Sequence, residues 1–173
     1  IRGAISIAAR LRDPMSALVK IDPKSLGIGQ YQHDVNQNKL TKKLNDITFS
    51  LVNKVGVDLN SASYKLLSFV SGISEKLAKN IIEHKNSING FSQKEQLLKV
   101  KGEGAKAYEQ SVGFLRIKDG ISYLDNSGIH PENYELANYL KNSCDLEELE
   151  RSALKELSLK FDCGLESLKD ILV

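Results

Sequence analysis

The stretch that decides the fold is residues 60–116, in which a glycine-centred break occurs twice, as VSGIS at 70–74 and as VKGEG at 100–104. Apolar residues at helical spacing come before and after each break. Gly is less favourable than Ala inside a helix by about 1 kcal/mol, and it is used where the backbone needs a positive φ or where another group comes close. The repeat therefore predicts two pairs of helices, each joined by a tight glycine turn.

The sequence around this repeat also has the spacing of helices. Residues 3–19 predict a helix that Pro14 bends or ends. A polar stretch at 21–37, punctuated by Gly and Pro, predicts a loop. One long amphipathic helix is then indicated by Leu40, Leu44, Ile47, Leu51 and Val55. After residue 30 no alternating pattern is long enough to indicate a strand, so the chain is predicted to be mainly α.

Short polar motifs predict where individual helices begin. Asn60 and Ser61 are candidate N-caps for the first helix of the repeat. Ser92 with Glu95 forms a candidate capping box before its third helix. Asn89-Gly90 predicts the turn between the two halves, and Pro131 fits the first turn of a helix in the tail.

Charge and composition narrow the classes of function. The net charge is +2 at pH 7. Residues 1–53 and 54–120 each carry four more basic than acidic side chains, whereas residues 121–173 carry six more acidic than basic ones. The first two thirds of the chain could therefore face a polyanion. No apolar run approaches the ~20 residues of a membrane-spanning helix, so no membrane partner is expected.

The cysteines indicate neither a disulfide framework nor a metal site. Cys144 and Cys163 are the only two in the chain, and no His or further Cys pair lies at zinc spacing. We therefore expect no metal and no cofactor, and a reducing, cytoplasmic location.

The two glycine breaks are candidate phosphate-binding elements. The first N–H groups of the helix after each break lack helical partners and lie at the positive end of the helix dipole. Lys76 and Lys106 each follow four residues after a break glycine and could add charge-assisted contacts. Two hairpins related by approximate two-fold symmetry could hold both strands of a duplex without reading its bases. The candidate nucleic-acid-binding residues are Gly72, Ile73, Ser74, Lys76, Lys79, Gly102, Glu103, Gly104 and Lys106.

Residues 57–85, together with INGFSQKEQLLKVKGEGAKAYEQ at 88–110, resemble a tandem helix-hairpin-helix module of the kind found in DNA-uptake and repair proteins. The module's pattern is a hydrophobic residue, any residue, Gly, a hydrophobic residue and Gly. Ser74 replaces the second Gly of the first copy, and Glu103 replaces the middle hydrophobic residue of the second. We expect Glu103 at the phosphate-facing tip, where it would repel a phosphate and leave the second hairpin with weak binding or a protein partner.

Residues 1–40 resemble the end of the RNase H-like YqgF domain of Tex proteins, a family of bacterial transcription accessory proteins. FDCGLESLKDIL at 161–172 is similar to the Tex segment that precedes the OB-fold RNA-binding domain. The resemblance implies three parts. Residues 1–36 would end the RNase H-like domain and form a linker, residues 37–118 would be the long helix plus the tandem module, and residues 119–173 would be a helical region before the OB-fold. It also implies DNA or RNA as a partner, with the transcription machinery as a further one.

Two other functions stay open at this point. The helices could be a scaffold that positions neighbouring RNA-binding and RNase H-like domains, with the acidic tail at Glu147, Glu148 and Glu150 as a protein-docking surface. A residual nuclease would need several carboxylates that converge on metal ions. Asp13, Asp22 and Asp34 are the acids at this end of the chain, and nothing in their spacing shows that they converge. No catalytic residue and no enzyme activity are therefore expected.

Overall fold

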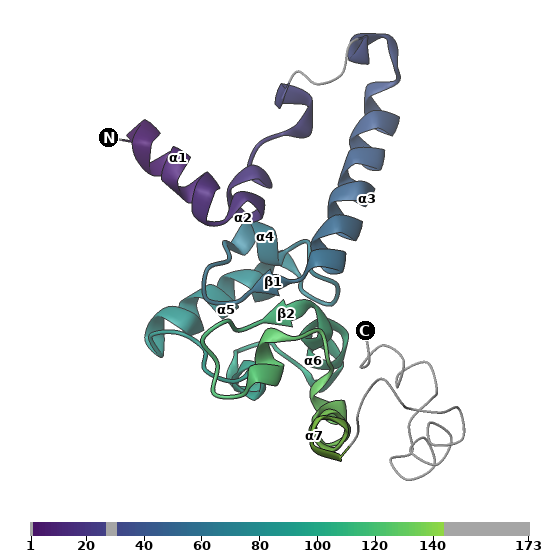
Figure 1. The fold of residues 1–173 in the computed structure, drawn as a ribbon. Coiled ribbons are helices and arrows are strands. Elements are labelled where there is room, and N and C mark those ends of the chain that lie inside the picture. Colours follow the sequence, from purple (N-terminus) through teal and green to yellow (C-terminus); the bar gives the residue numbers. More distant parts are fainter. Residues whose placement is uncertain (1, 27–30, 144–173) are drawn as a thin grey trace, which may run out of the picture.

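The computed structural model describes residues 2–26 and 31–143, and within them the chain is mainly helical (Figure 1). The predicted fold class is therefore confirmed. The α-helices are α1 (Arg2–Arg12), α2 (Pro14–Leu18), α3 (Gln37–Val55), α4 (Tyr64–Leu67), α5 (Glu75–Ser87), α6 (Ala105–Ser111) and α7 (Tyr134–Ser143). The 3₁₀ helices are η1 (Pro23–Leu26), η2 (Gln32–Asp34), η3 (Lys94–Lys99), η4 (Val112–Phe114), η5 (Tyr123–Asn126) and η6 (Pro131–Asn133).

The first helical stretch is divided at Pro14, as its sequence predicts. Asp13 stands between α1 and α2, and its side chain accepts a hydrogen bond from the Ser16 N–H at 3.0 Å. Pro occupies the first position of α2, where its missing N–H costs nothing. The chain therefore turns between α1 and α2 because a cap and a proline stand side by side.

Helix α3 rises from the body of the molecule (Figure 1) and ends at Gly56, whose φ is +81°. Its apolar residues keep helical spacing, yet Ile47, Leu51 and Val55 are 45%, 54% and 61% exposed. Within α3 only Val52 is buried. The predicted long helix is confirmed, but much of its apolar surface stays exposed.

A buried core holds the two halves of the repeat together. Residues that lie thirty positions apart occupy equivalent places. Leu67 and Leu97 are fully buried, and Val70 and Val100 are at most 3% exposed. The same backbone hydrogen bond recurs in each turn, from Ile73 N to the Val70 carbonyl (3.1 Å) and from Glu103 N to the Val100 carbonyl (3.0 Å). The predicted repeat is thus a structural one.

Two short parallel strands close the repeat upon itself. β1 (Val57–Asp58) pairs with β2 (Leu115–Arg116), with Val57 opposite Leu115 and Asp58 opposite Arg116. This pairing joins the residues just before the repeat to the residues just after it. Strands of two residues are too short to show an alternating pattern, which is why the sequence did not predict them.

The N-cap predicted before the first helix of the repeat is wrong. Ser63 caps α4, where its hydroxyl accepts from the Leu66 N–H at 3.3 Å. Asn60 has a long-range partner instead: its side-chain amide donates to the Phe91 carbonyl (2.9 Å), and its side-chain oxygen accepts from the Phe91 N–H (2.8 Å). The side-chain amide therefore pairs with the backbone N–H and carbonyl of a residue thirty-one positions away rather than with a helix end.

The predicted capping box of Ser92 and Glu95 is wrong, because Gln93 and Gln96 form the box before η3. The side-chain oxygen of Gln96, not that of Glu95, accepts from the Ser92 N–H at 2.8 Å. Gln93 is the N-cap of η3, so the box begins one residue later than the sequence suggested.

A buried polar cluster attaches the segment after β2 to the second half of the repeat. The Lys94 ammonium is buried and donates to the Ser127 carbonyl (3.0 Å) and the Ile129 carbonyl (3.4 Å). The pKa of Lys94 is lowered to about 8, mainly by burial and in smaller part by the charge of Arg116. The turn at Pro131 opens η6, which leads directly into α7 as predicted. No described helix has both the length and the apolar character needed to cross a membrane.

Candidate nucleic-acid interface

The two glycine turns adopt the backbone conformation that their sequence predicts. In the first hairpin (residues 70–76), Gly72 has a φ of +83°. In the second hairpin (residues 100–106), Gly102 has a φ of +90°. Residues that carry a Cβ rarely adopt this left-handed region of φ, so the turn itself requires glycine at both positions.

Each hairpin packs against the second helix of the other. A Cβ at Gly72 would lie only 2.9 Å from the Gln110 Cβ and 3.1 Å from the Ala107 carbonyl oxygen, both in α6. Reciprocally, the Asn80 side-chain amide of α5 donates to the Lys101 carbonyl at 2.6 Å, beside Gly102. Asn80 and Gln110 each lie eight residues after the glycine of their own hairpin. The two hairpins are therefore related by approximate two-fold symmetry.

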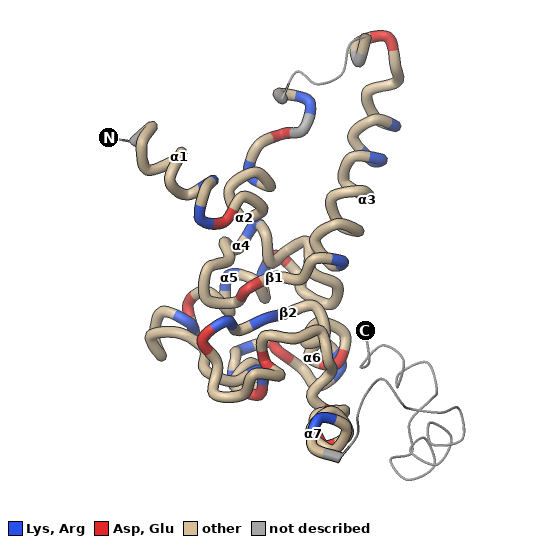
Figure 2. Tube along the Cα trace, in the orientation of Figure 1, with Lys and Arg blue, Asp and Glu red and all other residues tan. Residues whose placement is uncertain are grey.

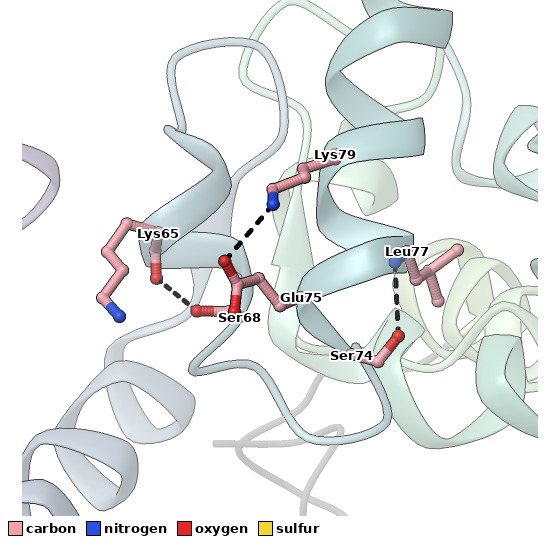
Figure 3. Close-up of polar contacts among 6 residues, drawn as sticks. All are labelled: Lys65, Ser68, Ser74, Glu75, Leu77 and Lys79. Atoms are coloured by element: carbon pink, nitrogen blue, oxygen red, sulfur yellow. Dashed lines mark hydrogen bonds and ion pairs between the residues drawn. The ribbon is translucent and has the colours of Figure 1, made fainter.

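The first hairpin ends in a well-capped helix with free backbone donors. The Ser74 hydroxyl accepts from the Leu77 N–H at 3.2 Å, as the N-cap of α5 (Figure 3). Among the described residues, the N–H groups of Glu75 and Lys76 donate to no backbone or side-chain oxygen. Because α5 runs for 13 residues, these donors lie at the positive end of an extended helix dipole.

The lysines of the first hairpin differ in what they contact. The Lys79 ammonium lies 3.4 Å from the Glu75 carboxylate (Figure 3) and 5.7 Å from the centre of the Tyr64 ring. Lys76 is exposed and has no ion-pair partner in the described part of the chain. Its charge is therefore available to a ligand, whereas that of Lys79 is partly neutralised.

The second hairpin has a more open turn. Gly104 is the N-cap of α6 and contributes no side-chain hydrogen bond, and a Cβ there would meet nothing within 4 Å. Lys106 is exposed, like Lys76, and the described residues give it no ion-pair partner either. The structure thus places both predicted lysines on the surface, each in the first turn of a helix.

The expected position of Glu103 at the hairpin tip is wrong. Both of its carboxylate oxygens are buried, and no hydrogen bond to them is present. Burial raises the pKa of Glu103 to about 7, and the nearby Ser111 hydroxyl offsets a smaller part of this rise. The same hydroxyl donates to the Tyr108 carbonyl at 3.4 Å. Glu103 occupies the place that Ile73 fills in the first hairpin, so the turn directs this side chain inward whatever its polarity.

The acids considered for a nuclease have structural partners of their own. Asp22 accepts from the Lys24 N–H at 3.0 Å, and Asp34 lies 3.2 Å from the His33 ring, with both side chains exposed. Asp13 is the N-cap of α2. Within residues 2–26 and 31–143, no three His, Cys, Asp or Glu side chains come together as metal ligands do. Cys144, Cys163 and the acidic residues Glu147, Glu148 and Glu150 lie outside the described residues.

Basic residues also follow α3, away from the hairpins. Figure 2 shows lysines along this helix, while acidic and basic residues are interspersed in the body. Lys39, Lys42 and Lys43 are all exposed. The sequence indicated their charge only as part of the excess of basic residues over 1–53, and the signal that would have singled them out is their spacing along one helix.

Two family matches cover most of the chain. Residues 52–116 match the helix-hairpin-helix motif, and residues 122–173 match a helix-hairpin-helix domain. The first match coincides closely with the segment that β1 and β2 close. The second was not foreseen from the sequence, which indicated only a helical region after residue 119, and most of it lies outside the described residues.

Named relatives extend this similarity to the flanking residues. The chain is 52% identical to the transcriptional accessory protein Tex of Neisseria gonorrhoeae over 78% of its length. It is 47% identical to protein tex of Bordetella pertussis over 91% of its length, and 47% identical to the human S1 RNA-binding domain-containing protein 1 over 68%. It spans only 12–20% of the length of these three proteins.

Proposed function

This chain belongs to the Tex family, and we propose that it binds nucleic acid by its sugar–phosphate backbone, through both hairpins and without reading base sequence. The observation that carries the proposal is the reciprocal packing of Gly72 and Gly102, which fixes two equivalent turns in one rigid unit. A rigid pair of turns can contact two phosphate strands at once, and backbone N–H groups and lysines carry no base specificity. The expected affinity is in the micromolar range of non-specific binding, and it falls steeply with salt.

Within the first hairpin, Lys76 is expected to contribute more to binding than Lys79. We expect Lys76→Gln to weaken duplex binding by about three- to tenfold, because it removes an unpaired charge at a helix N-terminus. It should also reduce the slope of log affinity against log salt by about 1. Lys79→Gln should weaken binding by less than about twofold, since Glu75 already neutralises part of that charge. Fluorescence anisotropy at two salt concentrations measures both effects.

A neutral variant of the paired acid provides the matched control. Glu75→Gln removes a negative charge beside Lys76 and frees Lys79, so it should strengthen binding. Lys20→Gln, an exposed cation outside both hairpins, should leave affinity within about twofold. Equal losses for Lys76→Gln and Lys20→Gln would show that binding depends on overall charge, and the hairpin assignment would then be abandoned.

A scaffold role is the second candidate, and exposed apolar helix faces favour it. Ile5, Ile7 and Leu11 of α1 are 63%, 68% and 88% exposed. Exposed apolar side chains of this kind occur at surfaces that contact other proteins. If the chain contacts transcription machinery directly, purified RNA polymerase should be retained by the immobilised chain after nuclease treatment. Loss of retention on nuclease treatment would instead assign the association to bridging nucleic acid.

A further inference from the structure

A cavity of about 400 Å³ lies where the α1–α2 junction meets the end of α3 and the two short strands. Its volume falls within the range of small-molecule sites, roughly 300–1,000 Å³. No residue of either hairpin lines it, so it is separate from the surface proposed above. Three cations line the cavity: Arg12, Arg116 and Lys118.

The Arg116 guanidinium is held rigidly at the wall of this cavity. A Cβ at Gly56 would lie 2.9 Å from its Cζ, and a Cβ at Gly128 would lie 3.0 Å from its Nη2. The guanidinium therefore fits between two glycines. Its Nη1 donates to the Gly113 carbonyl (2.7 Å) and the Leu115 carbonyl (3.0 Å). Nε and Nη2 have no hydrogen-bond partner among the described residues, so one edge of the planar group remains unused.

The two carboxylates that line the cavity, Asp13 and Asp58, have hydrogen-bond partners other than these cations. Asp13 uses both of its oxygens, which accept from the Ser16 N–H and the Ser61 hydroxyl, each at 3.0 Å. Asp58 accepts from the Asn60 N–H at 3.3 Å. No ion pair joins either acid to a cation of the cavity in the described part of the chain. Burial lowers the pKa of Arg116, and a half-buried cation without a counter-ion is unfavourable.

We propose that this cavity binds the phosphate monoester of a nucleotide, with Arg116 as the fork that holds the phosphate and with Arg12 and Lys118 at the rim. The free Nε–Nη2 edge can donate two parallel hydrogen bonds to phosphate oxygens, the geometry in which arginine recognises phosphate. Met15 and Val55, which also line the cavity, offer apolar contact to a base. The ligand is a free nucleotide or the phosphorylated end of a strand, since both present the same group.

Titration of the whole chain with adenosine monophosphate tests the proposal. We expect the backbone amide resonances of Gly56 and Gly128 to shift, because both glycines contact Arg116. The double variant Arg12→Glu/Lys118→Glu should bind at least about tenfold more weakly. Both side chains are exposed, so the fold should persist. Lys20→Glu/Lys99→Glu makes the same change of charge outside the cavity and should bind as the unaltered chain does.

Further arms identify the source of the phosphate and the outcomes that overturn the proposal. Arg116→Lys keeps the charge, loses the fork and should also weaken binding. If binding of a 5′-phosphorylated oligonucleotide requires Arg12 and Lys118, and binding of the same oligonucleotide with a 5′-hydroxyl does not, the site recognises strand ends. If only the binding of the free nucleotide requires these two residues, the site recognises mononucleotides. No shift at Gly56 and Gly128, equal binding by the rim and control variants, or equal affinity for inorganic phosphate would overturn the proposal. Duplex binding through Lys76 is scored separately, so either proposal can fail without the other.

Discussion

Gly72→Ala is expected to lower the free energy of unfolding by about 2–5 kcal/mol, which is a large share of the stability of a small domain. Two penalties act together at this position. Ala at a φ of +83° is strained by about 1–2 kcal/mol. The new Cβ would also lie 2.9 Å from the Gln110 Cβ and 3.1 Å from a backbone oxygen of α6, which cannot move without shifting the helix. Urea unfolding followed by circular dichroism measures the loss.

The second hairpin supplies matched controls for Gly72. Gly102 has a similar φ of +90°, but a Cβ there would lie 3.5 Å from the end of the Asn80 side chain. Gly102→Ala should therefore cost only the strain, about 1–2 kcal/mol. Gly104→Ala, at a negative φ with open space around it, should cost about 1 kcal/mol or less. If Gly72→Ala and Gly102→Ala cost the same, the contact of the first hairpin with α6 contributes nothing beyond the turn.

Helix-breaking and helix-capping residues made much of this fold predictable from sequence. Pro14 separates α1 from α2, Gly72 and Gly102 form the turns before α5 and α6, and Ser74 caps α5, because each of these residues acts on its own backbone within a few positions. The repeat of about thirty residues then indicated two equivalent hairpins. Their mutual packing was also readable in principle, since Asn80 and Gln110 occupy equivalent places in the repeat.

Features that depend on distant partners could not be predicted. Asn60 has the residue type of an N-cap, yet it bonds to the backbone of Phe91. The charged cavity is formed by Arg12, Gly56 and Arg116, which are far apart in sequence and share no local motif. Residue type alone placed Glu103 at the surface, whereas the turn buries both of its carboxylate oxygens. The boundaries at residues 36 and 118, and the RNase H-like origin of residues 1–36, stay predictions.

Glu103 makes the second hairpin sensitive to pH, and its replacement should stabilise the chain at alkaline pH. The unfolded carboxyl titrates at 4.5 and the folded one at about 7. Between these values the unfolded state has lost its proton and the folded state keeps it, so stability falls as the pH rises through this window. Above about 7 both states are ionised and the penalty is constant. Because the group is only partly buried, we expect about 1–3 kcal/mol after solvent screening.

Glu103→Ile, which copies Ile73 of the first hairpin, should therefore raise the free energy of unfolding by about 1–3 kcal/mol at pH 8, with a gain that shrinks towards pH 5. Glu103→Gln should remove the pH dependence while leaving a buried amide, so it separates titration from packing. Glu109→Gln is the control, because this acid lies on the exposed side of α6. Urea unfolding at pH 5 and pH 8 gives the comparison. A gain for Glu103→Ile that is equal at both pH values would mean that the buried carboxyl does not titrate in this range, and that packing alone distinguishes the two hairpins.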